Sequence, residues 1–284
     1  MKKSLFLVAV MAMTISLQTA CTKIYPPKVG TIERDTILGV PCCVYLPEDY
    51  DERVDAIQKV FPVLYLQHGM FGSENDWPEQ GHLLYYMDSL LRAQAVREMV
   101  IIMPDNFLGS VPPEERRTLM SAPNITPDGE SFDITNGSAH WRKLTYEQER
   151  GYEMSGYWEN HFEEFMKEVE LRYSVSRDPS QRAIAGLSMG GYHTRQVSQT
   201  LPGQFGYIAL FSALVTPPYS LEGNEKAFYW IGMGKEDFLY DQMQDYRHWL
   251  EENHFEYTYY ESPGGHIWPN WQDYLCRYLT KLFR

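Results

Sequence analysis

Short apolar runs and helical apolar stripes alternate along most of the chain. Residues 61–66 and 99–103 are continuous apolar runs of the length of a buried strand, and the apolar residues between them recur at helical spacing: Leu83, Leu84, Met87, Leu90 and Leu91. We expect further strands at residues 31–46, 182–185, 207–211, 228–231 and 256–260, and helices around 162–173, from 190, over 239–253 and from 271. This order predicts an α/β fold with a mostly parallel central sheet and helices on both faces.

The alternation stops between Phe107 and Tyr152, where proline and polar residues dominate. Connections longer than about 15 residues are unusual in compact domains and are often lids or binding loops. We therefore interpret residues 107–152 as an insertion over the functional site. A solvated decoration with short helices is the alternative.

The start of the chain has the pattern of a bacterial export signal. Lys2 and Lys3 precede an apolar run from Leu5 to Leu17, and small Ala20 stands directly before Cys21. A cysteine at this place resembles the lipidation site of bacterial lipoproteins. We expect a signal peptide at 1–20, a tether at 21–29 and one catalytic domain at 30–284. The protein would be exported, either held on the cell envelope through lipidated Cys21 or, without lipidation, secreted.

Composition excludes several other classes of protein. The 284 residues are 44% hydrophobic and carry a formal charge of −13, so a phosphate backbone would be repelled and nucleic acid is not an expected partner. The remaining cysteines, Cys42, Cys43 and Cys276, lack the spacing of a zinc cluster or a disulfide framework. We expect packed thiols, with a bridge from Cys276 to one of the pair as the alternative, and no metal or cofactor.

The segment Gly186-Leu187-Ser188-Met189-Gly190 matches the Gly-x-Ser-x-Gly nucleophile elbow, in which a sharp strand-to-helix turn raises a serine hydroxyl above the sheet. It follows the apolar run at 183–185 and precedes a plausible helix, as an elbow requires. The glycines are needed because side chains there would collide with neighbouring backbone. Ser188 is the expected nucleophile, and the amide of Met189 the expected first oxyanion donor.

A nucleophilic serine needs a base, which in this chain order must follow it. His193 lies too near along the helix, and His248 and His254 belong to a later helix and its end, so His266 in a glycine-rich loop is the candidate base. The acid should follow the strand at 228–231. We select Asp237 from that loop, with Glu236 and Asp241 as competitors.

A second oxyanion donor should come from the loop after the strand at 61–66. The amide of Met70 is the first choice and that of Phe71 the second, whereas a purely structural account gives the glycines of this loop only a turn to form.

Together these segments resemble the esterase D-like family of α/β-hydrolases, which includes feruloyl and acetylxylan esterases. The resemblance runs from about Cys43 to the end of the chain, through Tyr65 to Gly69, Gly186 to Gly191 and, most specifically, Gly264 to Pro269. It implies the α/β-hydrolase fold, the triad of Ser188, Asp237 and His266, and oxyanion donors at Met70 and Met189. The 107–152 insertion departs from the family and leaves the acyl group open.

The resemblance implies a serine esterase that forms an acyl-enzyme on Ser188 and releases feruloyl or acetyl groups from plant polysaccharides or their fragments. Candidate contacts to a sugar or aryl group are Phe71, Trp77, Trp141 and Trp268, with Trp158 as a further ring. For each of these tryptophans except Trp268, which lies beside His266, core packing is the favoured interpretation. Rival functions are an acyltransferase or a lipid or siderophore esterase with the same triad, and a glycan-binding protein on an inactive scaffold.

Overall fold

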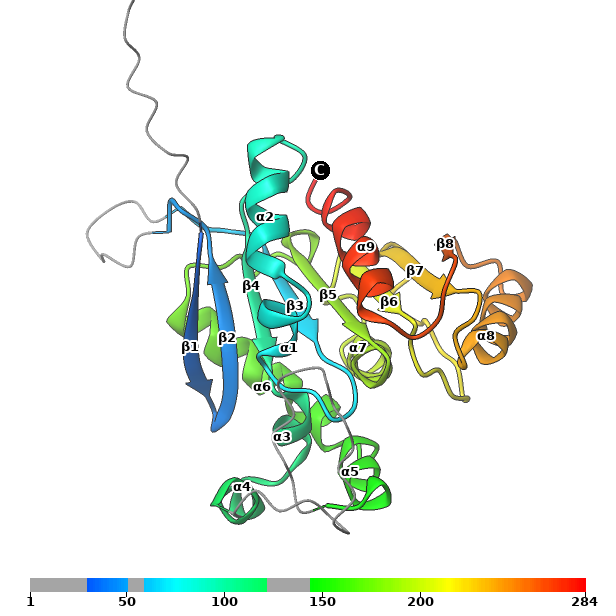
Figure 1. Ribbon diagram of the computed structural model, residues 1–284, viewed down its shortest axis with the longest axis horizontal. Helices are drawn as coiled ribbons and strands as arrows, with labels where there is room; N and C mark the ends of the chain where they lie inside the picture. The colour runs from blue at the N-terminus through cyan, green and yellow to red at the C-terminus, as the bar shows by residue number, and fades with distance from the viewer. Residues whose placement is uncertain (1–29, 51–58, 122–143) are drawn as a thin grey trace, which may run out of the picture.

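The computed structural model describes residues 30–50, 59–121 and 144–284, and in this part of the chain the strands form one eight-stranded sheet in the order β1-β2-β4-β3-β5-β6-β7-β8 (Figure 1). The pairs β1–β2 and β2–β4 are antiparallel, and the remaining pairs are parallel. The strands are β1 (Thr31–Ile37), β2 (Val40–Leu46), β3 (Val63–Gln67), β4 (Val100–Pro104), β5 (Arg182–Leu187), β6 (Tyr207–Phe211), β7 (Phe228–Gly234) and β8 (Thr258–Ser262).

Helices cover both faces of this sheet, as Figure 1 shows. Side chains of α6, α7 and α8 belong to one apolar cluster, and those of α1, α2 and α9 to the other. The described helices are α1 (Asp76–Glu79), α2 (Leu83–Arg92), α3 (Asn106–Ser110), α4 (Pro113–Ser121), α5 (Tyr146–Glu153), α6 (Tyr157–Arg172), α7 (Met189–Thr200), α8 (Tyr240–Glu252) and α9 (Trp268–Leu279). The predicted α/β-hydrolase architecture is confirmed.

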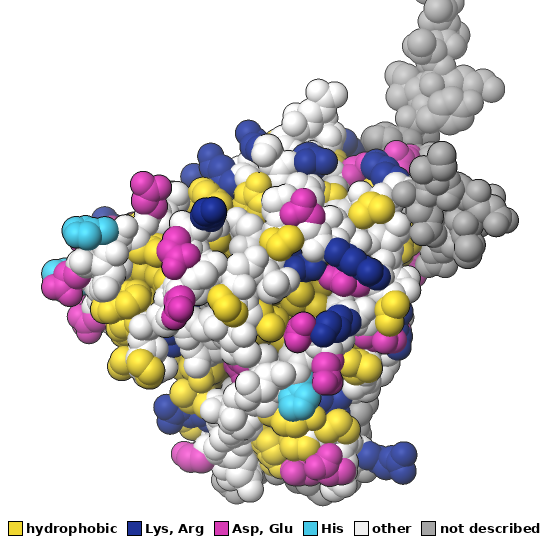
Figure 2. Space-filling model, turned by 180° about the vertical axis from the view of Figure 1, so that it is seen from behind, with side chains coloured by type: hydrophobic (Ala, Val, Ile, Leu, Met, Phe, Trp, Pro, Cys, Tyr) yellow, Lys and Arg dark blue, Asp and Glu magenta, His cyan; other side chains and the backbone are white. Residues whose placement is uncertain are grey.

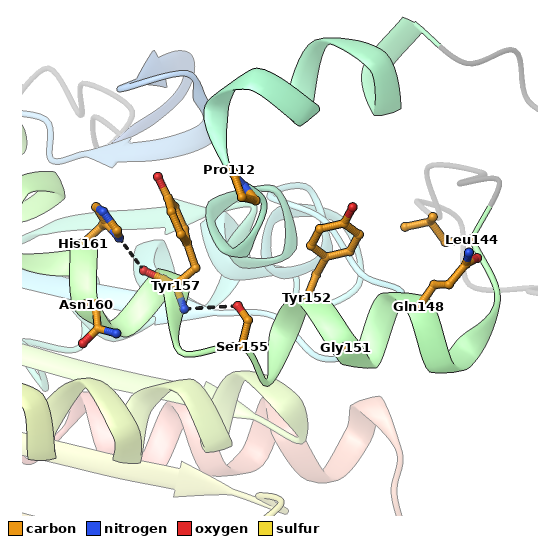
Figure 3. Close-up of a pocket in the computed structure, with 9 residues that line it drawn as sticks. All are labelled: Pro112, Leu144, Gln148, Gly151, Tyr152, Ser155, Tyr157, Asn160 and His161. Atoms are coloured by element: carbon orange, nitrogen blue, oxygen red, sulfur yellow. Dashed lines mark hydrogen bonds between the residues drawn. The ribbon is translucent and has the colours of Figure 1, made fainter.

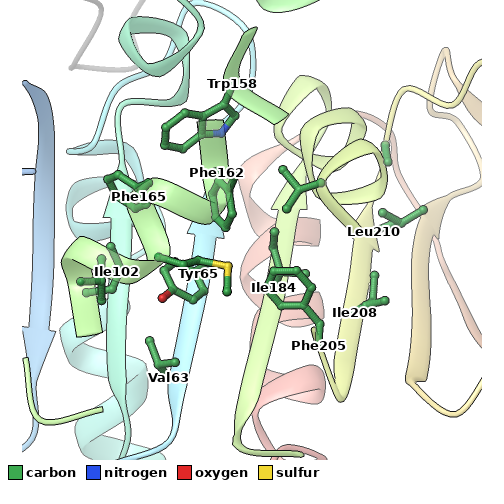
Figure 4. Packing of buried hydrophobic residues seen from close by; sticks show 14 of the residues in the cluster. Val63, Tyr65, Ile102, Trp158, Phe162, Phe165, Ile184, Phe205, Ile208 and Leu210 are labelled. Atoms are coloured by element: carbon green, nitrogen blue, oxygen red, sulfur yellow. The ribbon is translucent and has the colours of Figure 1, made fainter. Parts of the chain in front are cut away.

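Alternation along each strand divides the core into its two layers. On β2, Cys42 and Val44 join the cluster under α6, whereas Cys43 and Tyr45 join the other, because successive side chains of a strand point to opposite faces. Under α6, rings of Trp158, Phe162 and Phe165 pack on the apolar residues of the sheet (Figure 4). Cys42, Cys43 and Cys276 are free thiols, so the expected packed thiols are present and the alternative bridge is not formed.

Several boundaries differ from those expected. The helix expected around 162–173 begins at Tyr157, and the strand expected at 228–231 extends to Gly234. The last helix begins at Trp268 rather than Trp271, because Pro269 fits the first turn of a helix, where its missing N–H has no partner to lose. Strand β8 begins two residues later than expected, at Thr258.

The 107–152 segment is helical where it is described: it includes most of α3, then α4 and most of α5. Helix α5 contacts α3 and α6 and so lies against the body of the domain. Trp141, the export signal at 1–20 and Cys21 lie outside the described residues.

Charged side chains of both signs are interspersed over the face shown in Figure 2. No helix among the described residues is long and apolar enough to cross a membrane.

Candidate active site

Three of the predicted site residues follow parallel strands of the same sheet. Ser188 comes directly after β5, Asp237 lies in the loop after β7, and His266 lies in the loop after β8. Because the carboxyl ends of parallel strands meet at one edge, the fold brings all three residues to that edge, where ligands bind in open α/β sheets.

Ser188 stands on a strained turn between β5 and α7. Its φ of 53° and ψ of −117° are unusual for a residue with a side chain, and such strain costs on the order of 1–3 kcal/mol. The turn is held because the Ser188 amide donates to the Phe211 carbonyl at 2.9 Å and the Leu214 amide donates to the Ser188 carbonyl at 3.1 Å. Neighbouring strand β6 and the loop after it therefore maintain the turn that carries the half-buried serine.

The glycines of the elbow are required by close backbone approach, as expected from the sequence. A Cβ on Gly186 would lie 2.3 Å from the Gly190 carbonyl oxygen, and a Cβ on Gly190 would lie 2.3 Å from the His68 carbonyl oxygen. The second contact shows that the elbow packs directly on the loop after β3. A Cβ on Gly69 in that loop would lie 3.3 Å from Ser188 Cβ, so the two segments meet at the serine.

Asp237 and His266 form a hydrogen-bonded pair. The Nδ1 atom of His266 lies 2.9 Å from Asp237 Oδ2 and 3.1 Å from Oδ1, which orients the ring and makes Nδ1 the protonated nitrogen beside a carboxylate. The Asp237 side chain is 0% exposed and the His266 side chain 19% exposed. The pair therefore has a buried acidic end and an imidazole that reaches the surface.

Burial alone would raise the pKa of Asp237, but hydrogen bonds from the His266 ring and the Leu239 amide outweigh it and hold that pKa below its ordinary value. Asp237 is thus ionised at neutral pH. Its competitors Glu236 and Asp241 are exposed, and neither has a hydrogen bond to His266 among the described contacts.

The His266 loop is fixed from both sides. The Glu236 amide donates to the Gly264 carbonyl at 3.0 Å, and the side-chain amide of Asn270 on α9 donates to the Gly265 carbonyl at 2.9 Å. The imidazole lies between the rings of Phe238 and Trp271, with centroid separations of 4.6 and 4.9 Å. Phe238 is 76% exposed beside the imidazole, and its apolar surface was not singled out from the sequence.

Among the described contacts the Ser188 hydroxyl forms no hydrogen bond with the His266 ring. Catalytic hydrogen bonds are often long without substrate and shorten in the reacting complex.

The loop after β3 is anchored through a buried histidine. The His68 amide donates to Asn106 Oδ1 at 3.0 Å, and the Asn106 amide donates to His68 Nε2 at 3.1 Å. His68 Nδ1 lies 2.7 Å from the Gly69 carbonyl oxygen, and it carries the ring proton because Nε2 accepts. This arrangement joins the loop to the start of α3.

Helix α5 supplies a second anchor, which the sequence analysis missed. The Phe71 amide donates to Oε1 of Glu149 at 3.2 Å, and Glu149 is only 3% exposed. The Phe71 ring, 47% exposed, lies 6.1 Å from that of Tyr146 on the same helix. Of the two amides considered for the second oxyanion donor, that of Phe71 is therefore occupied, whereas the Met70 amide has no partner among the described residues.

The predicted aromatic contacts divide into two groups. Trp77 is 1% exposed and donates from Nε1 to the Gln67 carbonyl at 3.1 Å, so it packs in the core and does not form the predicted substrate contact. Trp158, 2% exposed, donates to Gln67 Oε1 at 2.7 Å and is likewise a core residue. Trp268 is half-buried against Trp77, and Phe71 is exposed at the site.

Among the described residues, no group of three or more histidine, cysteine, aspartate or glutamate side chains could hold a metal ion.

A strained serine elbow, a histidine–aspartate pair and a glycine loop at the carboxyl edge of this sheet define the α/β-hydrolase class.

Residues 39–254 match the family model described as "Putative esterase", and the chain belongs to this family. A curated relative, an endo-1,4-beta-xylanase/feruloyl esterase of Xylanibacter ruminicola, is 27% identical over 196 residues. The alignment covers 68% of this chain but 22% of the relative, so the chain spans about a fifth of that longer protein.

Solved structures share the fold. A CE1 ferulic acid esterase from Anaeromyces mucronatus, in complex with ferulic acid, has a TM-score of 0.66 and 23% identity, with 92% of this chain and 94% of that chain covered. An S-formylglutathione hydrolase from Staphylococcus aureus has a TM-score of 0.61 and 19% identity, with 89% and 95% covered.

Proposed function

We propose that this chain is a serine esterase that hydrolyses feruloyl or acetyl esters on plant polysaccharides or their fragments. The observation that carries the proposal is the Asp237–His266 hydrogen bond of 2.9 Å at the sheet edge where Ser188 stands on its elbow. Membership of the esterase family and the likeness to feruloyl esterases support the reaction and the acyl group.

In the proposed reaction, Ser188 Oγ attacks the ester carbonyl carbon while His266 Nε2 accepts its proton. The carbonyl oxygen becomes an oxyanion, which the amides of Met70 and Met189 stabilise, the latter at the N-terminus of α7. His266 then donates the proton to the leaving alcohol oxygen as the C–O bond breaks. Water, deprotonated in turn by His266, attacks the acyl carbon, and His266 returns the proton to Ser188 Oγ as the Oγ–C bond breaks and the acid leaves.

Asp237 has a defined part in these steps. Its carboxylate keeps the proton of neutral His266 on Nδ1, which leaves Nε2 free to act as the base, and it stabilises the imidazolium that forms. The exposed rings of Phe71 and Phe238, on the oxyanion loop and beside the imidazole, offer apolar surface to an aromatic acyl group.

Hydrolysis of p-nitrophenyl acetate, methyl ferulate and acetylated xylan oligomers by wild type and Ser188→Ala tests this function. We expect turnover of at least one ester by wild type, labelling of Ser188 by a fluorophosphonate, and loss of both in the variant. Hydrolysis that survives Ser188→Ala rules out the mechanism, and wild type inactive on all three esters rules out the substrate class.

We also propose that residues 1–20 direct export and that lipid attached to Cys21 holds the protein on the cell envelope. The basic start, the apolar run and Ala20-Cys21 support this. Metabolic labelling with a palmitate analogue should mark wild type and not Cys21→Ala. Unlabelled, freely secreted wild type would contradict the anchor.

A further inference from the structure

A hollow in the surface lies between α5, the start of α6 and Pro112 just before α4 (Figure 3). Its volume is about 600 Å³, within the range of small-ligand sites. Glu149 on one side of α5 contacts the loop of Phe71, whereas Gln148, Gly151 and Tyr152 line the hollow from another side of the same helix. The hollow and the Phe71 loop thus lie on different sides of one helix, and a helix with its side chains is roughly 10 Å across.

A glycine forms the floor of this hollow without a structural need for it. Gly151 is helical, its φ is not in the left-handed region, and a Cβ added to it would meet no atom within 4 Å. Glycine inside a helix costs about 1 kcal/mol relative to alanine. By contrast, a Cβ on helical Gly109 would lie 2.5 Å from the Trp158 ring. At Gly151 the missing side chain leaves space that the protein itself does not fill.

The walls combine flat rings with uncharged polar groups. The Tyr157 ring stacks on His161 with centroids 4.0 Å apart and an angle of 20°, and in Figure 3 Tyr157 and Tyr152 stand on either side of Pro112. Gln148 Oε1 accepts the Thr145 amide, which leaves its side-chain NH₂ as a donor.

The Asn160 side chain is exposed and has no hydrogen bond among the described contacts. The lining residues include no carboxylate, lysine or arginine.

We propose that this hollow binds a neutral sugar ring of the glycan that carries the ester, an assignment that rests on the proposed function. Flat rings bury the apolar face of a sugar, and amide donors and acceptors pair with its hydroxyls. The net charge of −13 disfavours an anionic ligand. A glycan held on this side of α5 lies beside the edge where Ser188 reacts, which raises the local concentration of its esters.

Gly151→Leu places a branched side chain in the hollow, and Gly151→Ala is the matched control. Neither clashes with the protein, since the space above Gly151 is open, and both favour the helix. With a feruloylated or acetylated xylan oligomer, we expect Gly151→Leu to raise KM about tenfold with kcat unchanged, because stacking and hydrogen bonds to one sugar are lost. Methyl ferulate kinetics should not change in either variant, and Gly151→Ala should resemble wild type on both substrates.

Binding of de-esterified neutral xylan oligosaccharides, measured by calorimetry, separates this inference from the esterase proposal. Binding by wild type that Gly151→Leu weakens supports the site even if no ester is hydrolysed. Wild type that does not bind these oligosaccharides, or equal binding and equal polymer KM in Gly151→Leu, overturns it.

Discussion

Replacing Glu149 by alanine tests whether helix α5 holds the proposed oxyanion loop in its active shape. Glu149 Oε1 accepts the Phe71 amide at 3.2 Å, and Phe71 has a φ of 63°. That left-handed conformation costs a residue with a side chain about 1–2 kcal/mol. Without its acceptor the Phe71 amide is unpaired at a strained position, and the loop is expected to relax away from this conformation.

The magnitude follows from the lost hydrogen bond. A hydrogen bond to a carboxylate contributes about 1.5–3 kcal/mol. This corresponds to a roughly 10- to 150-fold change in the fraction of molecules whose loop holds the Met70 amide in its active position. Because that amide is proposed to stabilise the oxyanion formed in the transition state, we expect kcat to fall by this factor and KM to change by less than about threefold.

The assay is steady-state hydrolysis of methyl ferulate, with binding of a boronic acid that mimics the tetrahedral intermediate as a second readout. Glu149→Ala should weaken the boronic acid in parallel with kcat. Glu149→Gln keeps an acceptor oxygen at the same place and should restore most of both. The role given to Glu149 would be refuted if kcat of Glu149→Ala equals that of wild type. It would also be refuted if Glu149→Ala and Glu149→Gln lose kcat equally while both keep the melting temperature of wild type.

Further outcomes are expected at three other residues. Because the pKa of Asp237 is lower in the folded state, its carboxylate stabilises the fold at pH values above the ordinary aspartate pKa of about 3.9. This stabilisation is lost as the pH falls through the lower folded pKa. The free energy of unfolding in urea should therefore fall more steeply with pH in this acidic range in wild type than in Asp237→Asn. At neutral pH Asp237→Asn should also lower kcat about 10⁴-fold, because His266 adopts the wrong tautomer. Gly190→Ala, with its Cβ 2.3 Å from the His68 carbonyl oxygen, should lower the free energy of unfolding by about 1–3 kcal/mol or more; an unchanged urea midpoint would contradict the close approach. Phe238→Ala should lower kcat/KM for methyl ferulate about tenfold and leave p-nitrophenyl acetate nearly unchanged; equal losses on both would mean that the ring only supports His266.

The parts predictable from sequence are those in which local pattern and tertiary position coincide. Strands β3 and β4 are buried on both faces, so their sequences are continuous apolar runs. The elbow is specified by Gly186 and Gly190, which lie two residues from Ser188 and have no room for a side chain. Asp237 and His266 follow from strand order, because parallel strands place their following loops at one edge.

The parts that could not be predicted depend on contacts between distant segments. Glu149 is 78 residues from Phe71 and lies in a segment whose polarity resembles a solvated loop. Trp77 sits between Asp76 and Pro78, and nothing in these neighbours distinguishes a buried indole from an exposed one; the carbonyl of Gln67 that pairs its Nε1 is supplied by β3. The one local signal for α5 is the capping-box pattern, with Thr145 three residues before Gln148, at the start of the helix.

That pairing explains how a polar helix of eight residues can position a catalytic loop. Helices this short are marginal alone, and α5 lacks the apolar stripe that normally secures one. Its N-terminus is instead closed by a capping box, in which Thr145 Oγ1 accepts the Gln148 amide at 3.3 Å and Gln148 Oε1 accepts the Thr145 amide at 2.9 Å. Glu149 and Glu153 are buried, so the side of α5 that carries them faces the domain. Since the capping Gln148 also lines the hollow above Gly151, the same short helix connects the proposed sugar site to the loop proposed to stabilise the oxyanion.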